Sequence, residues 1–319
     1  MRLGDIYRTA VEFGIGEDGR GREGVERALV AAREAYDRLE EDDRAFFDAE
    51  GLTNPYADTR VVLGGPDTEV RGLIVGIDME VGEVLLADRL RERGAPIDLI
   101  LAHHPEGPGF ARLHEVMGMQ ADLWAAQGVS IAAADSLMEP RAEEVRRRIL
   151  PANHYRSVDA ARELGFALMS CHTPADNAVN AFVQRHIDAE APGTLDKLVK
   201  VLRAIPEYAD AARKGYGPSI VLGTGSARPG RVVADMTGGT EGPADALDRL
   251  SQAGVGTLVG MHYSEEHRKR AEELKLNLVI AGHVSSDTLG MNLVLDAVEA
   301  LGSVEIVCVS GMVRVSRRG

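Results

Sequence analysis

The sequence predicts an α/β fold built as two α/β lobes, with mixed or largely parallel sheets covered by helices. Two observations lead to this prediction. Short apolar runs bounded by Gly or Asp alternate with stretches of helical periodicity, at the spacing of βαβ units. This alternation occurs on both sides of a polar, helix-prone connector. The length of 319 residues exceeds one typical domain, which also favours two lobes.

Residues 1–50 are predicted to form an N-terminal helical extension. Apolar residues from Val25 to Phe46 recur at spacings of three and four, with charged residues between them, so we expect one helix over residues 22–49. The turn residues of "LTNPYADT" follow it.

Residues 51–190 form the first predicted lobe. Strands are expected at the apolar runs "RVVLG", "GLIVGID", "IDLILA", "VSIAAA" and "FALMSC". The expected helices cover residues 81–93, 111–127, 139–149 and 156–164.

Residues 191–216 form the helical connector, and residues 217–319 form the second lobe. Strands are expected there at "SIVLG", "RVVADM", "TLVGM", "LNLVIAG" and "VEIVCVS". The expected helices cover residues 243–253, 264–274 and 286–301. The sequence has no strict internal repeat.

Composition excludes several classes of partner. The net charge of −14 argues against a nucleic acid or an anionic membrane, because both bind basic surfaces. A small phosphorylated ligand stays possible, because it needs only a local site. The chain has no signal-peptide pattern and no apolar run near the ~20 residues that cross a bilayer. Its two cysteines, Cys171 and Cys308, fit a reducing compartment, so we expect a cytoplasmic protein.

Two adjacent histidines end an apolar run in "LILAHHPEG", residues 99–107. Pro105 disfavours helical backbone at the residue before it, so His104 should be extended. In an extended chain, neighbouring side chains point to opposite sides. His103 and His104 could not easily share one metal ion, whereas two ions ~3.5–4 Å apart would suit them.

A second loop, "SCHTPADN", places His172 at the end of a strand and Asp176 four residues later. A structural alternative needs no metal. Thr173 as the N-cap, Pro174 at the first helical position and Asp176 in the first turn would together make a complete helix start.

A third loop, "AGHVSSD", places His283 at the end of a strand and Asp287 four residues later. Here too a helix start is an alternative explanation, because Ser285 can cap a helix and Asp287 would complement the helix dipole.

All three loops leave strands at the carboxyl end, where ligands bind in open α/β sheets. Together they offer three imidazoles and two carboxylates, which suit two divalent ions with a carboxylate bridging them. We expect His172 to orient Asp176 rather than to bind an ion. The predicted metal ligands are His103, His104, Asp176, His283 and Asp287.

The stretches "LILAHHP", "SCHTPADN" and "NLVIAGHVSSD", in this order, resemble the NGG-interacting-factor-three-like family, whose members are often labelled GTP cyclohydrolase I type 2 homologues or dinuclear metal centre proteins. The resemblance runs from about residue 51 to the C-terminus. It implies two similar lobes with two metal ions between them and a ring-shaped homohexamer. By motif it implies the same ligands, His103, His104, Asp176, His283 and Asp287.

The sequence departs from the family pattern in three places. Many relatives have glutamate where Asp287 stands, and many have a Gly-Glu pair near Gly260, where this chain reads Gly-Met-His. The first fifty residues match no feature of the family.

A two-metal site with open positions activates water, so hydrolysis is the expected chemistry, on a phosphoester or on the ring of a purine nucleotide. Glu106 or His262 is the candidate for moving protons. The expected cofactors are two divalent ions, Zn, Fe or Mn, and the expected substrate is a small molecule such as a nucleotide.

Two other interpretations are open. The chain could be a non-catalytic metal-binding or regulatory protein that acts through protein partners. The histidines could instead end strands in a metal-free core, but adjacent buried imidazoles without partners are costly to desolvate.

Overall fold

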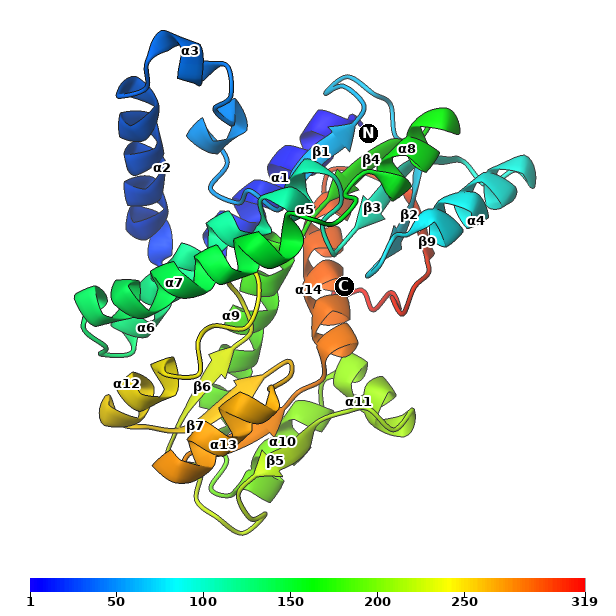
Figure 1. Cartoon of the computed structure of the whole chain (residues 1–319). Coiled ribbons are helices and arrows are strands. Elements are labelled where there is room, and N and C mark those ends of the chain that lie inside the picture. The colour runs from blue at the N-terminus through cyan, green and yellow to red at the C-terminus, as the bar shows by residue number, and fades with distance from the viewer. Residues whose placement is uncertain (319) are drawn as a thin grey trace.

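Two sheets organise the chain, and two long helices stand between them. The structure is a computed structural model that describes residues 1–318. Figure 1 shows one sheet in the upper part of the molecule and the other in the lower part, with α9 (Thr173–Glu190) and α14 (His283–Glu299) connecting the two. The predicted class, α/β with mixed, mostly parallel sheets, is confirmed. Among the helices of residues 1–318, none is both long and apolar enough to span a bilayer.

The first sheet has five strands in the order β1-β4-β3-β2-β9. Only β1 is antiparallel to its neighbour. The strands are β1 (Arg60–Leu63), β2 (Gly72–Gly76), β3 (Ile97–Ala102), β4 (Ala167–Ser170) and β9 (Glu305–Cys308). The strand expected at "VEIVCVS" in the second lobe is β9, and it pairs instead with β2 of the first sheet. After β8, α14 is long enough for the chain to return to the first sheet.

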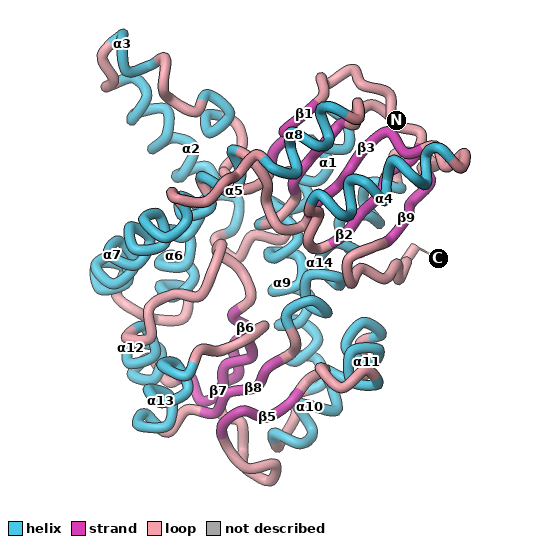
Figure 2. The backbone as a smooth tube through the Cα atoms, turned by 45° about the vertical axis from the view of Figure 1, so that its right-hand side comes forward, coloured by secondary structure: helices cyan, strands magenta, loops and turns pink. Residues whose placement is uncertain are grey.

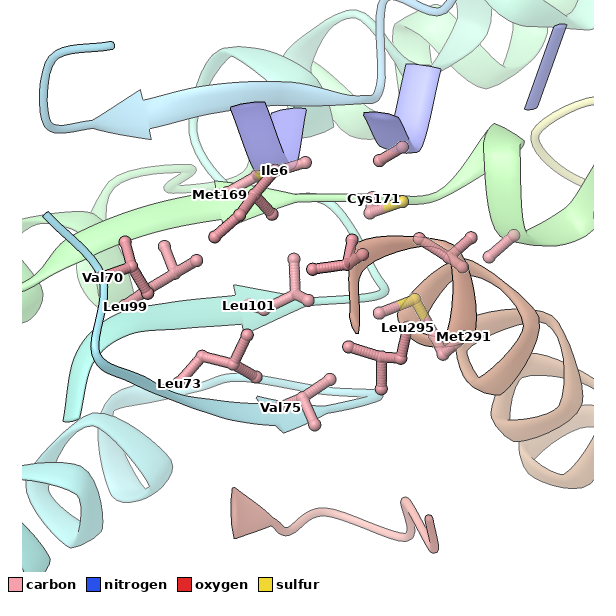
Figure 3. Packing of buried hydrophobic residues seen from close by; sticks show 14 of the residues in the cluster. Ile6, Val70, Leu73, Val75, Leu99, Leu101, Met169, Cys171, Met291 and Leu295 are labelled. Carbon is pink, nitrogen blue, oxygen red and sulfur yellow. The ribbon is translucent and has the colours of Figure 1, made fainter. Parts of the chain in front are cut away.

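Helices cover both faces of the first sheet. Ile74 and Ile100 face α4 (Val81–Glu92) and α8 (Arg156–Glu163), whereas Leu99 and Leu101 on the other face pack against α14 and α1 (Leu3–Gly16). Figure 3 shows Ile6 of α1 above Met169, and Met291 and Leu295 of α14 beside the ends of the strands. The first helix is therefore part of this core.

The second sheet has four strands in the order β5-β8-β7-β6, with β5 antiparallel to β8. They are β5 (Ser219–Leu222), β6 (Arg231–Asp235), β7 (Val255–Gly260) and β8 (Asn277–Ile280). Side chains alternate between faces as a strand requires. Val259 and Val279 pack against α9, α10 (Leu195–Arg203) and α11 (Pro206–Arg213), whereas Leu258 and Leu278 pack on the opposite face, with α12 (Ala246–Gln252) and α13 (Glu265–Leu274).

A segment between β3 and β4 crosses to the second lobe. It contains α5 (Pro108–Ala111), η2 (Leu113–Gly118), α6 (Met119–Ala126) and α7 (Ile131–Ile149). Trp124 of α6 and Met138 of α7 belong to the same buried cluster as Leu258. The expected strand "VSIAAA" is wrong, because this run begins α7. Short apolar runs do not distinguish strands from buried helix, and the alanines favour helix.

The helix expected over residues 22–49 is shorter and broken. α2 (Gly21–Asp37) is followed by α3 (Glu41–Arg44) and the 3-10 helix η1 (Ala49–Leu52). Figures 1 and 2 show α2 and α3 projecting from the rest of the molecule. Phe46, predicted on the apolar face, is 84% exposed. The apolar spacing continues there, but no other element packs against it.

The two sheets, which Figure 2 shows as two groups of strands, repeat one plan, because the order β1-β4-β3-β2 in the first corresponds to β5-β8-β7-β6 in the second. β2 and β3 pair from Gly72↔Ile97 to Gly76↔Ala102 with one register shift after the first pair, and β6 and β7 pair in the same way up to Asp235↔Gly260. Asp235 in the second lobe therefore occupies the position of Gly76 in the first.

Candidate metal centre

The predicted ligands come from three strand ends in two sheets. His103 and His104 follow β3, Asp176 lies in the first turns of α9 after β4, and His283 and Asp287 lie in the first turns of α14 after β8. The structure brings all five together. Ligand atoms lie within 4.8 Å of one another in the groups His103–Asp176–Asp287, His104–His283–Asp287 and His103–His104–His172.

Asp287 lies at the centre of the cluster. Its Oδ1 is 3.5 Å from His103 Nε2, and its Oδ2 is 3.7 Å from His104 Nε2 and 3.6 Å from His283 Nε2. Asp176 Oδ1 lies 3.5 Å from His103 Nε2. The adjacent histidines thus meet different oxygens of the same carboxylate.

The imidazoles are oriented by acceptors on their other nitrogen. His103 Nδ1 lies 3.2 Å from the carbonyl of Cys171, and His104 Nδ1 lies 2.7 Å from Asp78 Oδ1. Because carbonyl and carboxylate oxygens only accept, each Nδ1 carries the proton and each Nε2 presents a lone pair to the cluster. Lone pairs of Nε2 and carboxylate oxygens thus face each other and would repel unless a proton or cation lay between them.

Burial dominates the electrostatics of this cluster. It lowers the pKa of His103 to about 4, which keeps the ring neutral and its lone pair free. It also raises the pKa of Asp176 well above its usual value. Burial opposes ionisation of Asp287 as well, but the nearby imidazoles, His103 first, hold its pKa below the usual range. The carboxyl groups of the cluster therefore have too few positively charged neighbours to balance them if both are ionised.

His172 was expected to orient Asp176 rather than to bind an ion. The structure places its Nε2 3.7 Å from Asp176 Oδ2 and its Nδ1 2.8 Å from Asp58 Oδ2. Although burial alone would lower it, the Asp176 and Asp58 charges raise the pKa of His172 to about 9. His172 also shares a potential ligand group with His103 and His104, so both roles are geometrically available.

The helix-start alternatives explain these loops less well. Thr173, the expected N-cap, is the first residue of α9, and its hydroxyl donates to Asp58 Oδ2 at 2.6 Å. Ser285, the other expected cap, lies inside α14 and donates to the carbonyl of Gly282. The rest of the alternative holds at α9, because Pro174 stands at its start and Asp176 in its first turn, so a helix start and a ligand role are both compatible with Asp176.

Sequence reasoning missed Asp58 and Asp78, which hold His172 and His104. Asp78 follows β2, at the same sheet edge as the predicted ligands, and Asp58 lies two residues before β1. The edge rule that selected the histidines would have found Asp78, because it ends the apolar run "GLIVGID". Asp58 had no comparable signal, since "YADT" reads as an ordinary turn.

The two residues predicted to move protons lie beside the cluster. Glu106 and His262 both line a cavity of about 540 Å³ that also reaches His104, Asp176 and Asp287. Burial raises the pKa of Glu106 to about 7. The His262 ring centroid is 5.1 Å from that of His283. Neither residue belongs to the three ligand groups.

The donor set fits divalent metal ions. Two ligands that each lie about 2.1 Å from one ion at tetrahedral angles are about 3.4 Å apart, close to the separations around Asp287. His103 Nε2, Asp176 Oδ1 and both Asp287 oxygens are buried without a hydrogen-bond partner. Buried polar atoms are normally paired, and a cation at the cluster would satisfy these atoms. The buried His and Asp groups can therefore hold a metal ion.

Comparison with solved structures identifies the fold. A NIF3 superfamily protein from Sphaerobacter thermophilus superposes with a TM-score of 0.70 at 26% identity, covering 80% of this chain and 92% of that one. This chain has a NIF3-like fold. The family resemblance of the histidine loops is thereby confirmed.

The fold of this NIF3-like chain also matches reduced HcgD from Methanocaldococcus jannaschii. The TM-score is 0.51 at 14% identity, over 84% of this chain and 94% of that one, which is a likeness of fold alone. No protein-family model and no curated protein sequence matches the chain.

Proposed function

We propose that this NIF3-like protein holds two divalent metal ions and is a metal-dependent hydrolase acting on a phosphoester or on the ring of a purine nucleotide. The observation that supports the proposal is the position of Asp287, with one carboxylate oxygen near His103 and the other near His104 and His283. A carboxylate in such a position can bridge two ions. The purine ring comes from the family resemblance alone.

The proposed ligand sets share Asp287. His103, Asp176 and Asp287 Oδ1 would hold one ion, whereas His104, His283 and Asp287 Oδ2 would hold the other. Imidazole and carboxylate ligands accept Zn, Fe or Mn. Three protein ligands for each ion leave positions open for water and substrate.

The chain's own residues would orient the site and move protons. When bound, two metal ions would lower the pKa of water and so supply the nucleophile for hydrolysis. Asp78 and the Cys171 carbonyl keep Nε2 of His104 and His103 directed at the cluster. Glu106 and His262, on the cavity wall, are proposed to exchange protons with substrate through their carboxyl and imidazole groups.

Metal content per chain tests the shared carboxylate. The wild type, dialysed and measured by elemental analysis, should hold near two equivalents. Asp176→Ala should lose the ion at His103, and Asp287→Ala should lose both. Asp245→Asn is the control, because Asp245 is exposed and outside the cavity. Little metal in the wild type after reloading with Zn, Mn or Fe would refute the proposal.

Turnover tests the reaction class. The metal-loaded protein would be assayed with 4-nitrophenyl phosphate, bis(4-nitrophenyl) phosphate and GTP, alongside equal concentrations of the free ions. We expect turnover that Asp287→Ala abolishes. Two equivalents of metal without turnover above the free ions would favour the alternative, a non-catalytic metal-binding or regulatory protein acting through partners.

We also propose the ring-shaped homohexamer that the family resemblance implies. Light scattering coupled to size-exclusion chromatography would measure it directly, and a monomer of 34.3 kDa would contradict it.

A further inference from the structure

A carboxylate outside the metal centre lines the same cavity. Asp235 is the last residue of β6, at the carboxyl edge of the second sheet. It borders the cavity of about 540 Å³ together with His104, Asp176 and Asp287, but it belongs to none of the three ligand groups. Asp235 is exposed, and within residues 1–318 its side chain makes no hydrogen bond and no ion pair with another residue.

The charged neighbour that acts on Asp235 is an acid, Glu241, and not a base. Partial desolvation by the surrounding cavity wall, and then the charge of Glu241, raise the pKa of Asp235 to about 6. Glu241 itself is engaged, because its Oε1 accepts the backbone N–H of Ser264 at 2.8 Å and lies 3.2 Å from His267 Nδ1. Asp235 therefore faces the cavity as an acceptor without a donor.

A second unpartnered group lies next to it. The Tyr263 hydroxyl is buried and has no hydrogen-bond partner. Its ring lies over Gly260, where an added Cβ would come within 2.7 Å of the hydroxyl. Gly260 is the register partner of Asp235 across β6 and β7. Burial and then the Asp235 charge raise the Tyr263 pKa, which keeps the hydroxyl protonated.

In the first lobe, neighbouring atoms fill the space at the position that corresponds to Asp235. Gly76 stands there, and a Cβ on it would lie 2.7 Å from Met79 Sδ and 2.9 Å from Ser310 Cβ, in the segment after β9. The second sheet has no strand like β9 beside β6. An acid at this position in the second lobe thus meets open space instead of a neighbouring strand.

The cavity also has an apolar part of its wall and a loop that hydrogen bonds hold in place. Trp124, Leu247 and Leu250 line it. The loop over residues 237–243 forms part of the wall, and Gln120 Nε2 donates to its carbonyls at Gly238 and Thr240, at 2.6 and 2.7 Å. An apolar pocket with a few convergent polar groups is the usual form of a small-molecule site.

We propose that Asp235 and the Tyr263 hydroxyl recognise a nitrogen group that donates hydrogen bonds, on a ligand with an apolar or aromatic body. The group is a protonated amine or amidine, or the amino group of a neutral heterocycle. A ligand held there reaches toward the metal cluster along the shared cavity, and in this respect the inference rests on the proposed function.

Small probes test the site without requiring turnover. Dissociation constants would be measured by NMR titration of the full-length protein, with metal content determined on the same sample. Benzamidine carries a protonated donor group and 2-aminopyrimidine a neutral one, whereas benzoate and pyrimidine are the matched probes without donors. We expect the donor probes to bind more tightly than their matched partners.

Variants assign the binding to Asp235. Asp235→Asn should weaken the donor probes by about tenfold or more, since a charged acceptor is lost. Tyr263→Phe should weaken them less, and Asp245→Asn should leave them unchanged. Binding of benzamidine alone identifies a cationic ligand group, and binding of 2-aminopyrimidine as well identifies an amino heterocycle.

Equal affinities in wild type and Asp235→Asn, or equal affinities for benzamidine and benzoate, would overturn the inference. The two proposals fail separately. A sample without metal whose probe binding still depends on Asp235 would refute only the metal centre. A metal-loaded sample with no donor preference would refute only the Asp235 site.

Discussion

The two lobes have the same succession of strands, but different groups stand at the strand ends. After β3, the first lobe continues as His103-His104, whereas after β7 the second continues as Met261-His262. His104 reaches the Asp287 carboxylate, at 3.7 Å, and His262 reaches only the ring of His283, with 5.1 Å between the centroids. Equivalent backbone thus places one histidine in the cluster and the other on the cavity wall.

The helices after the last parallel strand differ in the same way. α9 begins at Thr173 and α14 at His283, so Asp176 is the fourth residue of its helix and Asp287 the fifth. Before α9 stands His172, whereas before α14 stands Gly282, with φ 112° and no room for a Cβ beside Ser285 Oγ. The His/Asp cluster is therefore asymmetric, although the sheets repeat.

This difference shows that the fold sets where the site lies, at the carboxyl ends of the strands, and that the residues of the following loops set which groups it contains. Parallel strands bring their carboxyl ends to one edge in each sheet. Single residues after those strands decide which strand ends contribute ligand groups to the cluster and which only line the cavity. Substitutions at equivalent positions of the two lobes therefore have different expected outcomes.

The largest expected contrast is between the two equivalent histidines. His104→Ala removes a proposed ligand and should weaken retention of the second ion by more than about a hundredfold. His262→Ala should keep the full metal content and lower kcat by about 10²–10⁴-fold, the range for a lost proton-transfer group. Elemental analysis after dialysis and steady-state kinetics would measure both. Loss of metal from His262→Ala would break the comparison.

The next contrast concerns the acid that orients His104. Asp78→Ala frees the His104 ring, and loss of such a hydrogen bond typically lowers metal affinity by about 10–100-fold. The corresponding residue after β6 is Thr237, whose hydroxyl donates instead to Asn177 Oδ1, at 2.7 Å. Thr237→Ala is the matched control and should keep wild-type affinity. Chelator competition with Zn would measure both, and equal affinities in the two variants would contradict the orienting role.

The sequence was sufficient to select the proposed ligands that the structure brings together, but not the residues that hold their side chains in place. His103, His104, Asp176, His283 and Asp287 follow strands, so strand prediction together with the edge rule brings them together. Asp58 is different, because its contacts with His172 and Thr173 join residues more than a hundred positions apart. No local pattern marks such a pair.

Fold prediction had a similar limit. Periodicity identifies which face of a helix is apolar, but not which surface it covers. The helices expected over residues 111–127 and 139–149 were therefore assigned to the first lobe by their place in the chain, whereas α6 and α7, which cover most of these residues, pack on the second. The exposed Phe46 is the opposite case, an apolar position whose covering partner the spacing could not supply.

A smaller effect should follow from the different edges of the two sheets. β9 pairs with β2 in the first lobe, whereas backbone groups at the free edge of β6 form hydrogen bonds with side chains of α9. The Gln184 amide accepts from the Ala234 N–H at 2.8 Å and donates to the Val232 carbonyl at 3.3 Å. Gln184→Ala leaves both groups unpaired and should lower the free energy of unfolding by about 1–3 kcal/mol.

Urea unfolding would measure this loss. The control is Gln252→Ala, on an exposed residue of α12, with an expected change under about 0.5 kcal/mol. Equal stability of the Gln184 and Gln252 variants would mean that α9 does not replace a strand at this edge.

The smallest expected effect is a pH-dependent shift in melting temperature at the position where Gly76 and Asp235 differ. The pKa of Asp235 is raised by partial desolvation and by Glu241 to about 6, above its value of about 3.9 in an unfolded chain. A raised pKa means that the stability contributed by the protonated carboxyl is complete below about pH 4 and is lost as the pH rises through about 6. Asparagine does not titrate, so Asp235→Asn should gain in Tm relative to wild type between pH 4 and 7. Calorimetry across this range would show it, with Asp245→Asn, on an exposed acid, as the flat control. A difference that stays constant with pH would mean that the folded chain does not raise the pKa of Asp235, and that its place on the cavity wall leaves the carboxyl as well solvated as in the unfolded chain.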